Sequence, residues 1–496
     1  MFISWVVFPL VLAVLALGCG LLLEQTTGWL LPGPLVLPAG LAVMIVVAGF
    51  TTATDATAEL TVPVIVFLAV AGVAVSVPWR DRRIEPWAIV AAVAVFVVFA
   101  LPTAATGTPT FAGYIKLDDT ATWFTLTDRV MEHGRNLNGL APSSYEATLD
   151  FNLASGYPVG AFLPLGIGRA LVGKDVAWLF QPYIAFLAAM LALTLYWLAG
   201  ALVRSRVLRA FAAVVAGQAA LLFGYSLWGG VKEVCAAALI ALAAALAPDA
   251  ARIPAGLLRL VPLAVAVAAV ISVVSVAGAV WLVPALVLAL VLAVQRLGFE
   301  QAALRGVAFA GMTALLSLPV FTASGFLPPT SSALTSDTAK GNLIDPLSPL
   351  QFFGIWPVGD FRLRPGDMDI TRLLIAVVVG IGLFGLWWAV RRRAWTLIAY
   401  VGTATLGCLA IAALGSPWVD GKTLAIASPA FLFAALVGAA VMFERGRRVE
   451  AVVIALAIAG SSGRTRSPIG MWTSLRTRGS PSWRESGSAS PARARR

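Results

Sequence analysis

Charged residues are scarce in this sequence, and their scarcity excludes an ordinary soluble fold. Only 12% of the 496 residues are charged, while 60% are hydrophobic. A soluble domain typically carries about 25% charged residues. Most of the chain must therefore face something other than water, and the hydrocarbon of a lipid bilayer is the environment that fits. We expect one packed bundle of membrane spans, not the several domains that this length would suggest for a soluble protein.

Cysteine and histidine are nearly missing, which excludes a zinc site and a disulfide framework. Cys19, Cys235 and Cys408 each lie inside an apolar run and form no Cys-x-x-Cys pair, and the single histidine is His133. A structural zinc site needs about four such ligands, and a disulfide scaffold needs paired cysteines. The first apolar run has neither a preceding basic stretch nor a small-residue cleavage site, so we interpret it as a retained span.

Basic charge is abundant in only one place, the C-terminal segment 461–496. This segment holds eight arginines and one glutamate, and so accounts for +7 of the net charge of +11. Elsewhere the basic residues lie mainly in short loops between apolar runs. That distribution is typical of membrane orientation and not of nucleic-acid binding. We therefore expect no nucleic-acid partner.

The composition of segment 461–496 also sets it apart, because it is rich in Arg, Ser, Gly and Pro and follows an unusually short apolar run at 449–460. We expect the segment to be disordered. A sharper hypothesis is that it is the product of a frameshift, and that the authentic chain continues the last span. Resequencing the coding DNA tests this hypothesis, and an intact frame would end it.

Fourteen apolar runs approach the length of roughly 20 residues that a helix needs to cross a bilayer. The predicted spans are 5–23, 35–50, 62–77, 87–105, 177–202, 210–228, 234–247, 257–276, 278–294, 304–321, 373–390, 395–414, 424–443 and 449–460. Two long polar loops interrupt them. We therefore predict an all-α polytopic bundle of about 13–14 spans. It divides into a four-helix region (1–105), a first loop (106–176), a six-helix core (177–321), a second loop (322–372), C-terminal helices (373–460) and the tail (461–496).

Arginine clusters predict the orientation, because Lys and Arg beside spans stay in the cytoplasm. The clusters lie at 80–83, 204–209, 391–393 and 445–448. With fourteen spans, all four fall on one side and both long loops fall on the outer face of the cell membrane. This requires that the short apolar stretch 159–172, broken by Pro164, does not cross but forms an interfacial or re-entrant helix. If it crossed, the cluster at 204–209 would face outward.

Charged residues that could take part in a reaction are concentrated in the first loop. Lys116, Asp118 and Asp119 lie there, at and directly after the extended-looking stretch FAGYIKL. Residues 120–133 have the spacing of a short amphipathic helix, which Gly134 can end. One interpretation is structural: Asp119 caps this helix, although that explains Asp118 less well because one cap suffices. The other is functional: one carboxylate is a general base, while the other orients the substrate or, with its neighbour, holds a divalent cation.

An acidic pair in an outer loop, followed by a short amphipathic helix and a Tyr-Pro entry to the next helix, resembles the GT-C superfamily of integral-membrane glycosyltransferases. This superfamily includes protein mannosyltransferases, aminoarabinose transferases and mycobacterial arabinosyltransferases. The matching residues are Asp118, Asp119, Tyr157 and Pro158. The sequence departs from the family in two respects. Its acidic loop follows the fourth span instead of the first, and Val159 replaces the second proline of the family's aromatic-Pro-Pro element.

The resemblance implies transfer of a sugar from a polyprenyl-phosphate donor to a glycan, lipid or protein acceptor of the cell envelope. An aspartate would accept the proton of the acceptor hydroxyl. The cellular location of sugar donors agrees with this expectation. Nucleotide sugars are cytosolic, so a transferase that faces outward needs a donor delivered within the membrane.

Basic side chains near the outer face are the candidates for binding the donor phosphate. Lys232 and Glu233 begin a span after a Gly-Gly turn, and an interpretation as a structural ion pair or interface anchor stays open. Lys422 lies on another outer turn, where snorkelling to the lipid headgroups is the alternative. Lys116 and Arg129 lie in the first loop, where they can offset the acidic pair.

Aromatic residues in the second loop, Trp356 among them, are candidates for contacting sugar or lipid, although interface belts use the same residues. A membrane transporter or lipid flippase is the alternative function, and a non-catalytic envelope assembly protein is a third. Transporters usually place ionisable groups at mid-membrane. Here the spans after the first loop carry almost no charge at mid-depth, which favours chemistry at the surface.

Overall fold

The structure, a computed structural model, describes residues 1–76, 85–105, 110–115, 117–252, 256–324 and 332–447. Within these ranges every regular element is a helix, and none is a strand. This follows from the composition, because a backbone inside hydrocarbon must satisfy its own hydrogen bonds and a helix does so within one segment. The predicted all-α fold class is confirmed.

The helices are separated mostly by short connections. In chain order they are η1 (Ile3–Val7), α1 (Phe8–Thr27), α2 (Gly33–Thr51), α3 (Asp55–Ala58), α4 (Thr61–Val75), α5 (Pro86–Ala105), α6 (Asp118–His133), α7 (Ser144–Leu153), α8 (Leu163–Val172), α9 (Val176–Ala199), α10 (Arg206–Ala216), α11 (Ala220–Leu227), α12 (Val231–Arg252), η3 (Leu257–Leu260), α13 (Val261–Val274), η4 (Val276–Gly278), α14 (Ala279–Leu297), α15 (Phe299–Leu316), α16 (Leu318–Ser324), α17 (Ser332–Thr335), η5 (Pro349–Phe353), α18 (Met368–Arg392), α19 (Trp395–Ala412) and α20 (Pro417–Glu444).

Eleven helical segments in the described part of the chain are long and apolar enough to cross a membrane, or up to thirteen if each of two bent pairs is one span. The first thirteen predicted spans, from 5–23 to 424–443, each coincide with one of these helices or bent pairs. The fourteenth, 449–460, lies outside the described residues. The chain is a multi-pass membrane protein folded as a helix bundle.

Two spans predicted as continuous are bent. Helices α10 and α11 meet at 55°, and α15 and α16 meet at 60°. The first break follows Gly217, and glycine is a poor residue for a helix interior. The second precedes Pro319, which has no N–H to donate to the helix. The first bend gives α11 a direction of its own, and therefore positions the turn between α11 and α12.

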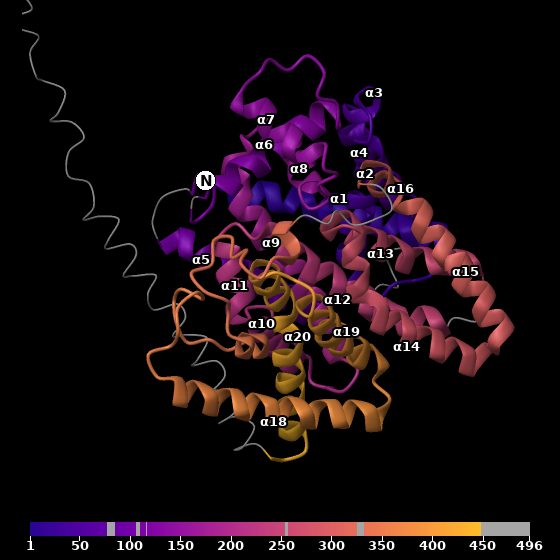
Figure 1. Cartoon of the computed structure of the whole chain (residues 1–496). Coiled ribbons are helices and arrows are strands. Elements are labelled where there is room, and N and C mark those ends of the chain that lie inside the picture. The colour runs from indigo at the N-terminus through magenta and orange to yellow at the C-terminus, as the bar shows by residue number, and fades with distance from the viewer. Residues whose placement is uncertain (77–84, 106–109, 116, 253–255, 325–331, 448–496) are drawn as a thin grey trace, which may run out of the picture.

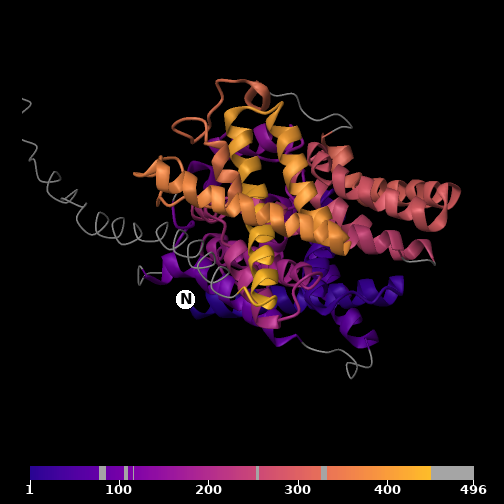
Figure 2. The same ribbon diagram turned by 90° about the horizontal axis from the view of Figure 1, so that it is seen from below.

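Three helices, α9, α12 and α20, form the interior and are buried along almost their whole length. Helix α12 packs against α9, α13, α14 and α19. In Figures 1 and 2 the N-terminal helices and helix α18 lie on opposite sides of the molecule, while α14 and α15 form an outer edge. Helices α4, α5, α14 and α15 expose large apolar side chains, such as Phe67 and Val307. These surfaces suit contact with lipid tails.

Small residues allow the closest helix contacts. A Cβ added to Gly72 of α4 would collide with the backbone carbonyl of Gly18 in α1, and one added to Gly385 of α18 would collide with the carbonyl of Ala434 in α20. Membrane helices associate through such small residues because lipid tails are as apolar as leucine, and close van der Waals packing must hold the helices together.

The described connections next to the arginine clusters meet at one end of the bundle. Glu444, at the end of α20, accepts hydrogen bonds from the backbone N–H groups of Arg204 and Ser205. The guanidinium groups of Arg392 and Arg445 both lie over the Trp388 ring. The ends of α18 and α20 therefore lie together with the start of α10, as the orientation argument requires.

The first long loop folds into α6, α7 and α8. Helix α8 has 10 residues, about half the number needed to cross a bilayer, so the stretch 159–172 fits the prediction that it does not cross. It packs against α1, α2, α6 and α9. The second long loop contains α17 and η5 and lies against α20.

Candidate functional site

A non-helical segment before α6, residues 111–115, brings the acidic pair to the turn between α11 and α12. The backbone N–H of Ala112 donates to the carbonyl of Ala177 at 3.0 Å, and that of Ile115 donates to the carbonyl of Leu227 at 3.0 Å. These bonds attach the segment to the start of α9 and the end of α11. The predicted extended stretch is wrong, because residues 111–115 form a turn and a bend, with Ala112 at a φ of +62° and Gly113 at +85°. The segment nevertheless delivers α6 to the loop that precedes Lys232.

Helix α6 begins two residues earlier than the structural interpretation requires. Leu117 occupies the N-cap and makes no side-chain cap, so Asp119 is the second residue of the helix. The prediction that Asp119 caps the helix is therefore wrong. The expected end is confirmed, because Gly134 follows His133 with a φ of +57°. Lys116 and the side chain of Asp118 lie outside the described residues.

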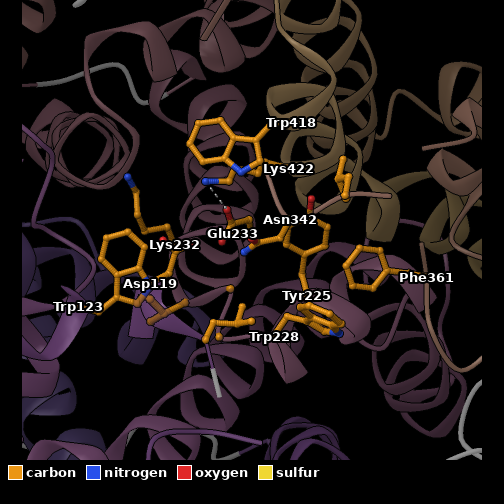
Figure 3. A pocket seen from close by; sticks show the side chains of 15 residues that line it. Asp119, Trp123, Tyr225, Trp228, Lys232, Glu233, Asn342, Phe361, Trp418 and Lys422 are labelled. Atoms are coloured by element: carbon orange, nitrogen blue, oxygen red, sulfur yellow. Dashed lines mark ion pairs between the residues drawn. The ribbon is translucent and has the colours of Figure 1, made fainter. Parts of the chain in front are cut away.

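An open cavity lies where the start of α6, the α11–α12 turn, the start of α20 and the second loop meet (Figure 3). Its lining combines two carboxylates, two lysines and several aromatic rings. The charged lining residues are Asp119, Lys232, Glu233 and Lys422. The aromatic lining residues are Trp123, Tyr225, Trp228, Phe361 and Trp418. The cavity therefore offers acids, cations and flat apolar surfaces together.

Lys422 and Glu233 form an ion pair between α20 and α12. The Nζ atom of Lys422 lies 3.7 Å from Oε1 of Glu233 (Figure 3) and 3.6 Å from the centre of the Trp418 ring. The Glu233 side chain is only 9% exposed, so burying its charge demands a partner such as Lys422. The sequence left open an ion pair between Lys232 and Glu233. In the structure Glu233 pairs with Lys422 instead.

Lys232 lies over an aromatic stack. Its Nζ atom is 4.0 Å from the centre of the Tyr157 ring, and that ring stacks on Trp123 at 5.5 Å. Trp123 stacks in turn on Phe162 at 5.2 Å. Burial, reinforced by the negative charges of Glu233 and Asp119, raises the pKa of the Tyr157 phenol well above its usual range. Tyr157 therefore stays neutral and presents its ring to the lysine.

The second loop supplies the opposite wall. Phe361 stacks on Tyr225 at 4.9 Å and meets Trp228 edge-on at 5.9 Å. The guanidinium of Arg362 lies 4.0 Å from the centre of the Trp228 ring and pairs with Asp360 at 2.7 Å. Aromatic faces of this kind suit the C–H surfaces of a sugar ring. The two long loops thus contribute to one cavity.

Two predicted site residues lie elsewhere. Arg129 is buried, and its guanidinium donates to the backbone carbonyls of Asn136 and Asn138, which holds the loop after α6. Trp356 is also buried, and its Nε1 donates to the carbonyl of Leu363 at 3.0 Å. Neither residue lines the cavity. The structure thus brings Asp119, Lys232, Glu233 and Lys422 together, with Tyr157 beside them, and leaves these two outside.

The aromatic walls were not chosen as site residues from the sequence. Trp228 directly precedes the Gly229–Gly230 turn, and Phe361 lies in the second loop. Each is therefore next to a segment that the sequence did single out. Nothing in a single sequence indicates that Phe361 packs on α11, because that contact joins residues far apart in the chain.

A cation at the acidic pair would have few protein ligands. In the part of the chain that the structure describes, no group of three or more His, Cys, Asp or Glu side chains could hold a metal ion. Asp119 could offer a carboxylate oxygen, as could Asp118, whose side chain is not described. Water or a bound phosphate would have to complete the coordination sphere.

Comparison with known proteins does not assign the chain to a family. No protein-family model matches the chain, and no curated protein matches its sequence. The resemblance to the GT-C superfamily therefore depends on the residues and the helix arrangement given above.

Proposed function

We propose that this protein is a membrane glycosyltransferase that moves a sugar from a polyprenyl-phosphate donor to a cell-envelope acceptor on the outer face. The observation that carries the proposal is the convergence of Asp119, Lys232 and Lys422 on one open cavity. A transferase with a lipid-phosphate donor needs a proton acceptor, cations for the leaving phosphate and surfaces for the sugar. The cavity offers each of them.

In the proposed reaction, the hydroxyl oxygen of the acceptor bonds to the anomeric carbon of the sugar. Asp119 accepts the proton of that hydroxyl as the bond forms. The bond between that carbon and the phosphate oxygen breaks at the same time. The leaving phosphate takes up the electron pair, and Lys232 stabilises its charge, while Lys422 contributes less because it is paired with Glu233. Asp119 need not be a strong base, because it receives the proton only as the new bond forms. A divalent cation at Asp118 and Asp119 is compatible with this scheme, but no step requires one.

Orientation is part of the proposal. The cavity lies at the start of α20, where Lys422 pairs with Glu233, whereas the opposite end of α20 contacts Arg204 and the end of α18. Since arginines beside spans stay in the cytoplasm, the cavity would open to the outside. The buried native cysteines permit a clean labelling test. In intact cells a membrane-impermeant maleimide should label N138C and should not label R392C. The reverse pattern would place the cavity in the cytoplasm.

The proposed activity is tested in membranes that contain the full chain. The double variant D118A/D119A should lose transfer of a labelled sugar from prenyl phosphate, whereas D345A/D369A, which removes two exposed carboxylates of the second loop and its boundary, should keep it. Undiminished transfer by D118A/D119A would contradict the mechanism. If solute uptake is lost instead, the transporter alternative gains. Analysis of envelope glycans after disruption of the gene would identify the sugar and the acceptor.

A further inference from the structure

Glu233 is a buried carboxylate beside the two lysines that the proposed function assigns to the donor phosphate. A negative charge next to an anion site weakens binding of that anion, so its presence calls for an explanation. Glu233 lies in the first turn of α12 directly after Lys232, and its carboxylate reaches across to Lys422 at 3.7 Å. It thus neutralises one of the two cations of the cavity.

Lys232, the other lysine, remains available to the phosphate of the donor. Lys232 lies over the Tyr157 ring at 4.0 Å, and no described carboxylate lies within ion-pair distance of its Nζ atom. A ring face attracts a cation but does not neutralise it. Among the described lining residues, the formal charges of Asp119 and Glu233 balance those of Lys232 and Lys422. Among the described lining residues, Lys232 is therefore the lysine that no carboxylate pairs, while Lys422 shares its charge with Glu233.

We infer that Glu233 is a specificity-determining residue, which restricts the cavity to donors with a single negative charge on the reacting phosphate and disfavours diphosphates. This inference rests on the proposed function. A phosphodiester between lipid and sugar carries one charge, which Lys232 can meet. The corresponding diphosphate carries two, and its second phosphate would have to displace Glu233 from Lys422 or lie beside it. Exclusion by such repulsion is a common basis of specificity.

The test uses two probes that differ by one phosphate: a short-chain prenyl methyl phosphate and the matching prenyl methyl diphosphate. Their binding to the full-length protein in detergent is measured by titration calorimetry. The native chain should bind the monophosphate more tightly. E233Q, which keeps the shape of the side chain and frees Lys422, should bind the diphosphate about tenfold more tightly than the native chain does.

The double variant E233Q/K422Q is the matched control, because it restores the native charge balance. It should again favour the monophosphate, whereas a preference set by shape alone would be the same in all three proteins. Equal binding of both probes by the native chain, or a preference that E233Q does not change, would overturn the inference and leave the transferase proposal intact. If neither probe binds, or if K232Q binds both as the native chain does, the phosphate site itself fails.

Discussion

Helix α6 carries charged residues at both ends, but the two ends differ in what surrounds them. At its start, Asp119 and Trp123 line the open cavity. At its end, Arg129 holds the following loop, and His133 contacts Asp55 of α3 at 3.1 Å. A charged side chain of this helix can therefore reach a substrate only at its start, where the cavity opens. The same residue types elsewhere on the helix hold the fold together.

Asp128 is a carboxylate of α6 that holds the fold and does not line the cavity. Its Oδ1 atom pairs with Arg169 of α8 at 3.2 Å, and the same guanidinium lies 3.6 Å from Glu132. Burial raises the pKa of the Asp128 carboxyl, while Arg169 acts in the opposite direction. These contacts join α6 to α8, so Asp128 serves as a natural control for Asp119.

Among the effects on binding and stability, the largest should come from the cavity. Replacing Lys232 with glutamine leaves the substrate phosphate without its cation, and we expect the dissociation constant of a prenyl methyl phosphate to rise about 30-fold, equivalent to ~2 kcal/mol. Titration calorimetry measures the change. K174Q, at an exposed lysine of the first loop, should bind as the native protein does. Similar losses in both variants would mean that general surface charge, not the cavity, attracts the anion.

Replacing Arg129 should change the free energy of unfolding by a similar amount but leave the transfer reaction intact. The variant R129A leaves the carbonyl of Asn136 without its donor and should lower the free energy of unfolding by about 2 kcal/mol. Transfer per folded molecule should stay near the native value. Unfolding is followed by circular dichroism in detergent. A variant with native stability but no transfer would place Arg129 in the reaction and remove the contrast between the two ends of α6.

The smallest effect is expected at His133. Its side chain and that of Asp55 are each about half exposed, at 47% and 49%, so the pair contributes on the order of 0.5 kcal/mol. H133A should therefore unfold at nearly the native temperature in a thermal scan. A loss of several kcal/mol would mean that the contact between α3 and α6 matters far more to the fold than its exposure indicates.

The spans could be predicted because the bilayer fixes both their length and their composition. Only local properties were needed, which is why all the described spans coincide with their predicted positions. The bends at Gly217 and before Pro319 were missed, because a residue that weakens a helix does not break it in every context. Here the packing of α11 on α20 favours a change of direction.

Single residues of the site could be predicted from the sequence, but the contacts between them could not. Asp119, Lys232 and Lys422 stood out because polar residues are rare beside apolar runs. Their partners depend on tertiary contacts that one sequence does not contain. The pairing of Glu233 with Lys422 joins α12 to α20, and the wall formed by Phe361 joins the second loop to α11. Arg129 had the right residue type and loop, but its side chain turns to backbone carbonyls instead of the cavity.

The most direct test compares the two aspartates of α6 in one assay. Transfer of labelled sugar from prenyl phosphate is measured at saturating donor with purified D119N and D128N, each corrected for its folded fraction. We predict that D119N loses at least about 100-fold in rate, the range expected for loss of a general base, while D128N stays within about twofold of the native chain, as expected of a residue that only supports the fold. Native rates in D119N, or equal losses in both, would contradict the assignment of Asp119 as the base.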